Sequence, residues 1–221
     1  MLRLGAVLAV LLAATLGAGY LLTRADEGDA FERVDRALVG WLADHRTATL
    51  DALSGPAAEL GNTGVVIALA AVAAVVAGWS YRSWRPAVVL AVVLCGELLV
   101  FLTTAAWIDR PRPPVPHLDA ELPPTSSFPS GHTAAAVCLY GALAALALVR
   151  VHRRGARVAV IASAVGIVAV VAAARLYRGA HYPTDLLGSV LFAVPWLIVT
   201  VRLLPLPTVA GPRGVGEWRG D

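Results

Sequence analysis

Two histidines lie in short polar segments beside long apolar stretches. His132 follows Ser130 and Gly131 where one apolar stretch begins, and His181 precedes Asp185 by four residues at the next such boundary. A carboxylate bonded to one imidazole nitrogen fixes the tautomer and leaves the other nitrogen free to attack an electrophile. The spacing therefore predicts a nucleophilic pair in His181 and Asp185, with His132 able to donate a proton nearby.

Arginines accompany both histidine segments. Arg110 and Arg112 are separated by a single proline, which stiffens the backbone and presents two guanidinium groups at low entropic cost. Arg175 and Arg178 precede His181 on the same segment. Guanidinium groups donate paired hydrogen bonds that match phosphate oxygens. Together these arginines favour an anion site of phosphate size.

The segment around His132 is typical of a helix start. Ser130 is a common N-cap residue, and Gly131 allows another backbone or a ligand to approach closely. The first amides of a helix are unpaired and attract anions, so we expect Ser130 and Gly131 to contribute to phosphate binding. Taken alone, each motif also has an ordinary interpretation as a helix cap, an interfacial histidine or a proline-rich loop.

The elements that position these residues are apolar and long. The chain has 221 residues, of which 58% are hydrophobic and 15% charged, and its mean hydropathy is +0.71. Soluble domains have roughly 45–50% apolar and 25% charged residues, so a soluble globule is excluded. A helix needs roughly 20 apolar residues to cross a bilayer core. The chain has six apolar stretches near that length, at residues 4–22, 61–79, 86–108, 133–149, 158–174 and 186–204.

These stretches are continuous and rich in alanine, valine and leucine, without the alternation of a membrane β-barrel. We therefore expect an all-α, polytopic membrane bundle of six transmembrane helices. A single domain covers residues 1–204, and residues 205–221 form a flexible cytoplasmic tail. The first stretch exceeds the roughly 7–15 residues of a signal-peptide core, which favours an uncleaved span over a signal peptide.

The distribution of charge predicts the orientation. All eighteen basic residues are arginine. One set of connections, 23–60, 109–132 and 175–185, holds eight arginines and twelve acids, whereas the opposite set holds ten arginines and two acids. Arginine-rich short loops favour the cytoplasmic side, so both termini are expected there and the histidine segments on the extracytoplasmic face. In a membrane protein, the net charge of +3 indicates orientation rather than a nucleic-acid partner.

Two further features carry polar residues in unusual places. A pattern of apolar residues spaced three and four apart predicts an amphipathic interfacial helix after the first span, and its members are Phe31, Val34, Leu38, Trp41 and Leu42. This helix could cover the mouth of the bundle or gate lipid entry. Glu97 lies near the middle of the third span, where an acid is either functional or a structural hydrogen-bonding group.

In this order, the polar segments resemble the three motifs of the phosphatidic acid phosphatase type 2 superfamily, over about residues 60–204. The matching residues are Arg112-Pro113, Pro129-Ser130-Gly131-His132, and Arg175 with His181 and Asp185. The resemblance implies metal-independent hydrolysis of a phosphomonoester or pyrophosphate through a phosphohistidine, without a cofactor or metal ion. It assigns His181 as the nucleophile, Asp185 as its orienting group and His132 as the acid. The implied phosphate ligands are Arg112, Arg175, Ser130 and Gly131.

The chain departs from the family pattern at one position. The first motif of the family is Lys-x6-Arg-Pro, and counting back from Arg112 places Ala105 where the lysine is expected, while counting from Arg110 gives Thr103. Losing a donor of this kind costs about 10²–10³ in rate. Arg110 and Arg178, which neighbour the motif arginines, are the candidate replacements.

A site at the outer headgroup level suits a phosphate on a lipid anchor, and an all-arginine chain with outward chemistry indicates a bacterial plasma membrane. Polyprenyl pyrophosphate, phosphatidic acid and phosphatidylglycerol phosphate all fit, with a slight preference for the polyprenyl carrier by analogy. Membrane lipids are the expected surroundings, without nucleic acid or an obligate protein partner. A lipid phosphotransferase and a weakened lipid-phosphate-binding protein are alternatives. Vanadium haloperoxidases share the anion site but are typically soluble, and a transporter or scaffold would leave the two histidines unexplained.

Overall fold

The computed structural model describes residues 2–24, 30–119, 122, 126–204 and 206. These residues form eight helices and no strand. The helices are α1 (Leu2–Arg24), α2 (Ala30–Asp44), α3 (Ala48–Glu59), α4 (Thr63–Tyr81), α5 (Arg85–Trp107), α6 (Gly131–Leu148), α7 (Arg154–Tyr177) and α8 (Pro183–Leu203). Six of them, all except α2 and α3, are long and apolar enough to cross a membrane, which confirms the predicted polytopic helical bundle.

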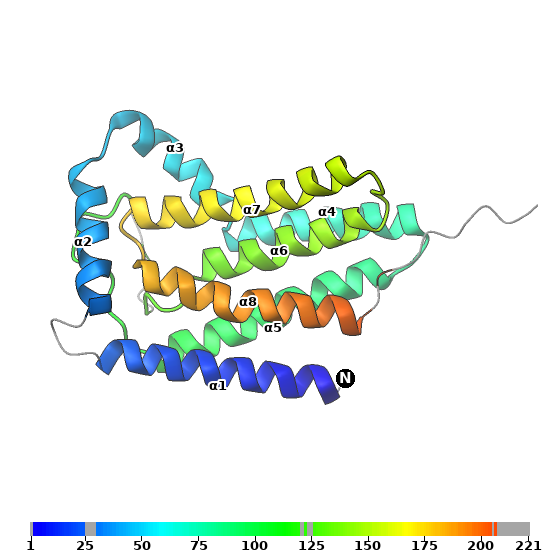
Figure 1. Ribbon diagram of the computed structural model, residues 1–221, viewed down its shortest axis with the longest axis horizontal. Coiled ribbons are helices and arrows are strands. Elements are labelled where there is room, and N and C mark those ends of the chain that lie inside the picture. The colour runs from blue at the N-terminus through cyan, green and yellow to red at the C-terminus, as the bar shows by residue number, and fades with distance from the viewer. Residues whose placement is uncertain (1, 25–29, 120–121, 123–125, 205, 207–221) are drawn as a thin grey trace, which may run out of the picture.

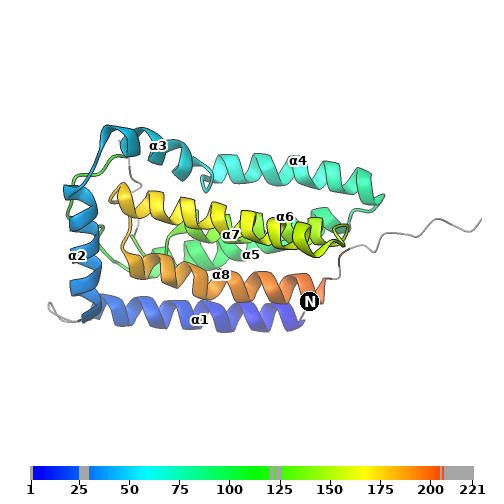
Figure 2. The ribbon, with the colours of Figure 1, turned by 45° about the horizontal axis from the view of Figure 1, so that its top comes forward.

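The six long helices run side by side, and α2 crosses one end of the bundle (Figure 1). The turned view in Figure 2 shows α3 joining this end of the bundle to the start of α4. The beginning of α1 and the α4–α5 and α6–α7 connections lie at the opposite end. All three polar segments therefore lie at the end that α2 covers, as the expected topology requires.

Helix α6 is the centre of the bundle. It packs against α4, α5, α7 and α8, and 56% of the residues in its most apolar 18-residue segment are buried. By contrast, only 6% of the residues in the most apolar segment of α4, and likewise of α7, are buried. Apolar faces of this size are not left in water by a soluble protein, so these helices present them to lipid.

Polar side chains fix where the helices begin at the site end. The Ser130 side chain accepts a hydrogen bond from the Thr133 amide and so caps α6, as the sequence predicts. The side chains of Asn62 and Thr47 cap α4 and α3 in the same way. Such caps satisfy amides that a helix start leaves unpaired, so they set the level at which His132 enters the bundle.

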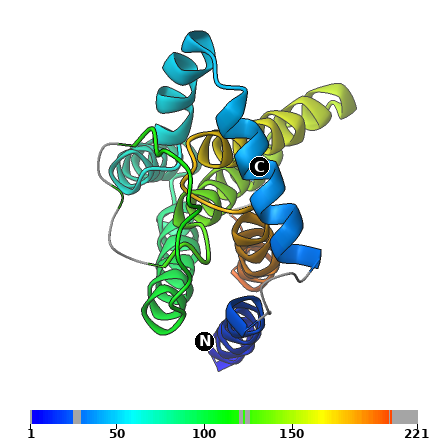
Figure 3. The ribbon, with the colours of Figure 1, turned by 90° about the vertical axis from the view of Figure 1, so that its left-hand side faces the viewer.

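The amphipathic helix predicted after the first span is α2, and Figure 3 shows it crossing in front of the ends of α7 and α8. Most of its apolar side chains face outward, with Phe31, Val34 and Trp41 each more than half exposed, whereas Asp35 and Val39 are each only 1% exposed. The helix therefore covers the mouth of the bundle and presents an apolar face suited to the membrane interface. Gating of lipid entry stays a prediction.

Helix α3 was not predicted from the sequence. Its twelve residues include Gly55 and Pro56, which weaken a helical pattern, and it packs along α7. The cap at Thr47 and the acidic Asp51 in the first turn are the signals that mark it. The predicted flexible tail, 205–221, lies outside the described residues apart from residue 206.

Candidate active site

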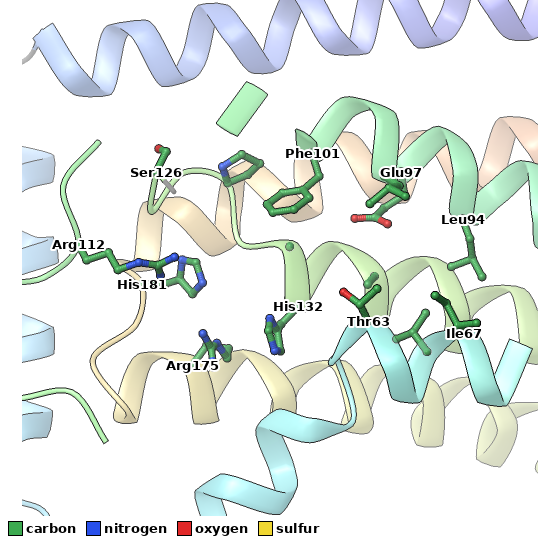
Figure 4. Close-up of a pocket in the computed structure, with 15 residues that line it drawn as sticks. Thr63, Ile67, Leu94, Glu97, Phe101, Arg112, Ser126, His132, Arg175 and His181 are labelled. Carbon is green, nitrogen blue, oxygen red and sulfur yellow. The ribbon is translucent and has the colours of Figure 1, made fainter. Parts of the chain in front are cut away.

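A cavity of about 230 Å³ opens at the end of the bundle that α2 covers (Figure 4). Helices α4 to α7 and the segments between α5 and α6 and between α7 and α8 form its walls. Its polar lining residues are Thr63, Glu97, Arg112, Ser126, His132, Arg175 and His181, and the apolar ones include Ile67, Leu94, Leu98 and Phe101. The structure thus brings both predicted histidines and two of the four predicted arginines to one cavity.

His181 is 4% exposed, and its Nδ1 atom lies 2.7 Å from the carbonyl oxygen of Ser127. A carbonyl only accepts hydrogen bonds, so Nδ1 carries the proton and Nε2 keeps a free lone pair. Burial lowers the pKa of His181 below its ordinary value, while the Asp185 carboxylate opposes that shift. His181 is therefore neutral at neutral pH, in the tautomer that a nucleophile needs.

Asp185 has a different contact from the one expected. Its Oδ2 atom lies 3.7 Å from His181 Nδ1, beyond hydrogen-bond distance, because Nδ1 donates its hydrogen bond to the Ser127 carbonyl instead. Asp185 instead accepts hydrogen bonds from the Tyr182 amide at 2.8 Å and from Arg110. Asp185 still lies within ion-pair distance of the ring, so it places negative charge beside His181 and caps the start of α8, and its role in orienting His181 stays a prediction.

Arg110 does not line the cavity. It is 8% exposed, donates to Thr184 and Asp35 at 2.8 and 2.7 Å, and forms an ion pair with Asp185. These acceptors occupy its guanidinium group, which corrects the expectation that Arg110 binds phosphate. Asp35 was not recognised as a site residue because an acid within an amphipathic pattern ordinarily marks a solvated face. The sequence offers no distinct signal for it, since Asp35 lies between Val34 and Arg36 in a run of mixed charge.

Arg178 is also held away from the cavity. Its guanidinium donates to Asp119 at 2.6 Å, to the Ser54 hydroxyl at 3.1 Å and to the Leu118 carbonyl at 2.8 Å. The phosphate-binding role expected for Arg178 is corrected in the same way, since its donors tie the α5–α6 segment to α3 and α7. Asp119 is the second site residue that the sequence analysis missed.

Arg175 and Arg112 do line the cavity. Arg175 donates from Nη1 to Asp119 at 2.9 Å, while its buried Nε has no hydrogen-bond partner among the described residues. Arg112 donates from Nη1 to the Ala180 carbonyl at 2.8 Å, and burial lowers its pKa from the ordinary value. Each guanidinium is thus held by a fixed acceptor and faces the cavity beside His181 in Figure 4.

His132 lies in the first turn of α6 and faces the cavity near Arg175 (Figure 4). The turn between α3 and α4 packs on its backbone: a Cβ at Gly61 would lie 2.6 Å from the His132 carbonyl oxygen. Only glycine permits this approach. The turn therefore fixes the level of His132 relative to His181.

Ser130 and Gly131, both expected to contribute to phosphate binding, differ in their positions in the structure. The Ser130 hydroxyl is fully buried and shares a 3.0 Å hydrogen bond with Thr133, so its contribution is the cap of α6. Gly131 lines the cavity, and a Cβ there would lie 2.9 Å from the Phe101 ring. The first amides of α6 consequently remain available to an anion.

Ala105, at the position of the lysine in the family motif, provides no positive charge to the site. Ala105 lies one helical turn beyond Phe101 on the same face of α5, and neither Ala105 nor Thr103 lines the cavity. Within the described part of the chain, no group of three or more His, Cys, Asp and Glu residues is placed to hold a metal ion.

Fold and site define a polytopic helical membrane protein with a cavity of histidines and arginines at one end of its bundle. The chain belongs to the PAP2 superfamily, which it matches over residues 59–207. It is 30% identical over 110 residues to phosphatidylglycerophosphatase B of Bacillus subtilis (strain 168), a match covering 49% of this chain and 53% of the relative. The chain thus aligns with about half the length of that curated relative.

Two solved structures share the fold. A crystal structure of a transmembrane PAP2 type phosphatidylglycerolphosphate phosphatase from Bacillus subtilis superposes with a TM-score of 0.72 at 22% identity, covering 91% of this chain and 94% of that one. The crystal structure of Aquifex aeolicus LpxE gives a TM-score of 0.59 at 21% identity, covering 75% and 93% of the two chains. The helical arrangement described above is therefore that of known PAP2 membrane proteins.

Proposed function

We propose that this protein is a membrane lipid phosphatase that hydrolyses a phosphomonoester or pyrophosphate of a lipid through a phosphohistidine intermediate. The observation that carries the proposal is the convergence of His181, His132, Arg112 and Arg175 on one cavity between membrane-spanning helices. Membership in the PAP2 superfamily and the name of the Bacillus subtilis relative support it.

In the first step, His181 Nε2 attacks phosphorus, and the bond between phosphorus and the leaving oxygen breaks. His132 gives its proton to that oxygen, which leaves as the lipid alcohol or lipid monophosphate. The proton stays on Nδ1, which keeps donating its hydrogen bond to the Ser127 carbonyl, and the nearby Asp185 carboxylate stabilises the positive charge that the phosphorylated imidazole acquires.

In the second step, water attacks the phosphohistidine and gives a proton to His132. The bond between phosphorus and Nε2 breaks, inorganic phosphate leaves, and His181 returns to its neutral form. Both histidines then have their starting protonation states, so the cycle needs no other proton carrier.

The cations around the cavity neutralise the oxygens of the transferring phosphoryl group. Arg112 and Arg175 supply guanidinium donors, and the start of α6 supplies amides and a positive helix end. Phosphoryl transfer depends mainly on such positioning and charge neutralisation, which these groups can provide without a metal ion. We therefore propose metal-independent hydrolysis.

The cavity wall suits a substrate that stays anchored in the bilayer. Ile67 of α4 is 61% exposed and Leu98 of α5 is 43% exposed, and both line the cavity. Their outer surfaces face lipid, so the phosphate of a membrane lipid can enter between α4 and α5 while its chains remain in the bilayer. The lining favours a lipid over a soluble phosphate.

We place the site on the extracytoplasmic face of a bacterial plasma membrane, with both termini in the cytoplasm. This orientation is supported by the arginine-rich 80–85 and 150–157 connections at the end opposite the cavity. Candidate substrates are polyprenyl pyrophosphate, phosphatidic acid and phosphatidylglycerol phosphate, the last being favoured by the name of the relative.

Phosphate release from these three lipids by the detergent-purified protein, measured in EDTA, tests the proposal. We expect release by the wild-type protein and by His152→Ala, a control in the connection at the far end of the bundle, but none by His181→Ala or His132→Ala. Release that requires an added metal ion, or that survives His181→Ala, would contradict the proposal.

A further inference from the structure

Glu97 is a buried acid that the proposed reaction does not use. Its side chain is 4% exposed and lines the cavity. No described residue forms a hydrogen bond or ion pair with its carboxyl group, and Figure 4 shows that group directed into the cavity on the side of Phe101. The interpretation of Glu97 as a structural hydrogen-bonding residue therefore has no partner to support it in the described part of the chain.

Glu97 lies deeper in the bundle than the phosphate ligands. It is four residues from Phe101 on α5, and the Phe101 ring packs against Gly131, where α6 begins. Four residues of helix rise about 6 Å. The carboxyl group is therefore one turn below the level of His132, on the path along which a lipid bound by its phosphate continues into the membrane.

The neighbours of Glu97 along this path are mostly apolar. Leu94, Leu98 and Ile67 line the cavity with it, and Thr63 is the polar residue on the same side in Figure 4. A carboxyl group at membrane depth without a polar partner is costly, and such residues ordinarily mark a binding site or a pathway. A ligand group that satisfies Glu97 must reach this level when the phosphate lies between Arg112 and Arg175.

A hydroxyl group meets this requirement best, because it both donates and accepts hydrogen bonds and so pairs with a carboxyl group in either protonation state. The second phosphate of a diphosphate would bring several acceptor oxygens and negative charge to the same place. A saturated or isoprenoid chain would leave the carboxyl group unpaired.

We propose that Glu97 binds a hydroxyl group of the lipid headgroup close to the scissile phosphoester, as in a glycerol phosphate headgroup. Glu97 thereby selects hydroxylated phosphomonoesters over diphosphates and over monoesters without a nearby hydroxyl. This specificity rests on the proposed phosphatase function and names its substrate class.

The test compares two substrates that differ only in this hydroxyl. One is phosphatidylglycerol phosphate, and the other is its deoxy analogue with a propane-1,3-diol phosphate headgroup. We expect the wild-type protein to prefer the hydroxylated lipid by about tenfold in kcat/KM, the effect of one hydrogen bond to a carboxyl group. Glu97→Leu should reduce that ratio to near one by slowing only the hydroxylated substrate.

Glu97→Gln keeps the size and polarity of the side chain and provides a second variant if the leucine variant does not fold. Its ratio should lie between those of the wild-type protein and Glu97→Leu. Cys95→Ala is the matched control, since Cys95 lies on the same helix but is exposed on its lipid side, and its ratio should equal that of the wild-type protein.

The two proposals fail in different ways. Equal rates on both lipids by the wild-type protein, or a ratio unchanged in Glu97→Leu and Glu97→Gln, would overturn the role of Glu97 while leaving the phosphatase function intact. Absence of phosphate release from both lipids, from phosphatidic acid and from polyprenyl pyrophosphate by the wild-type protein would overturn the proposed function and the role of Glu97 with it.

Discussion

At the scale of single residues, a backbone carbonyl sets the tautomer of His181. The sequence places Asp185 four residues away and so predicts a carboxylate for this task, but Nδ1 donates its hydrogen bond to the Ser127 carbonyl at 2.7 Å. Side-chain spacing cannot reveal such a contact, because Ser127 approaches through its backbone from a segment far away in the chain. The sequence indicates which residues meet at the cavity more readily than the hydrogen bonds that they form.

The depressed pKa of His181 gives the protein a definite pH response. Because burial favours the neutral imidazole, His181 should stay neutral well below pH 6.5, the approximate ordinary pKa of histidine. The unfolded chain takes up a proton there that the folded protein does not, so this residue stabilises the fold above about pH 6.5 and its contribution declines as the pH falls.

Carbon-13 NMR of labelled histidine, assigned by comparison with His181→Ala, measures this titration in nanodiscs. The His181 resonance should remain in its neutral position at pH 6.5, at which the imidazole of a free histidine peptide is about half protonated. A His181 midpoint at or above that of a free histidine peptide would contradict the burial argument.

The missing lysine predicts a gain of activity. Ala105 follows Phe101 by one turn on α5, and both arginines that could have replaced the lysine are bound to aspartates. Ala105→Lys should bring an ammonium group to the cavity mouth and raise kcat/KM for a lipid phosphate by up to about 10²-fold.

Phosphate release by Ala105→Met, which has similar length without the charge, is the control and should not exceed the wild-type rate. A lysine variant that is no faster than the methionine variant would show that the cavity already neutralises the phosphate fully.

At the scale of elements, α2 is joined to the site through buried charges. Asp35 of α2 binds Arg110 and Thr184, and Arg110 binds Asp185 at the start of α8. The amphipathic pattern predicts the helix correctly, but it orients Asp35 toward solvent. In the structure the apolar face is outside, because membrane lipid accepts it and the buried Arg110 needs a carboxylate.

Asp35→Ala should destabilise the fold, because it leaves the buried Arg110 with one carboxylate partner in place of two. We expect a loss of about 3 kcal/mol in the free energy of unfolding in detergent micelles, typical of a broken buried ion pair. Glu32→Gln is the control on the same helix, since its pair with the half-exposed Arg36 contributes only about 0.5 kcal/mol. Equal losses in the two variants would show that Asp35 is not energetically linked to the site.

At the scale of the whole molecule, hydropathy predicts most of the fold. Each predicted apolar stretch corresponds to a helix whose ends differ from it by a few residues, since the apolar length that spans a bilayer is encoded directly in composition. Hydropathy does not predict helix α3, because this helix is short, of mixed polarity and contains Pro56. The cavity requires the arrangement of four helices, which composition does not specify.

The convergence of His181 and His132 on one membrane-facing cavity makes a covalent phosphoenzyme the central claim. Rapid alkaline quenching of the protein with a lipid carrying ³²P in its terminal phosphate, followed by peptide mapping, tests it most directly. We predict acid-labile, alkali-stable label on the peptide that contains His181, retained in His152→Ala and absent from His181→Ala. Steady release of phosphate by the wild-type protein without label at His181 would contradict the account.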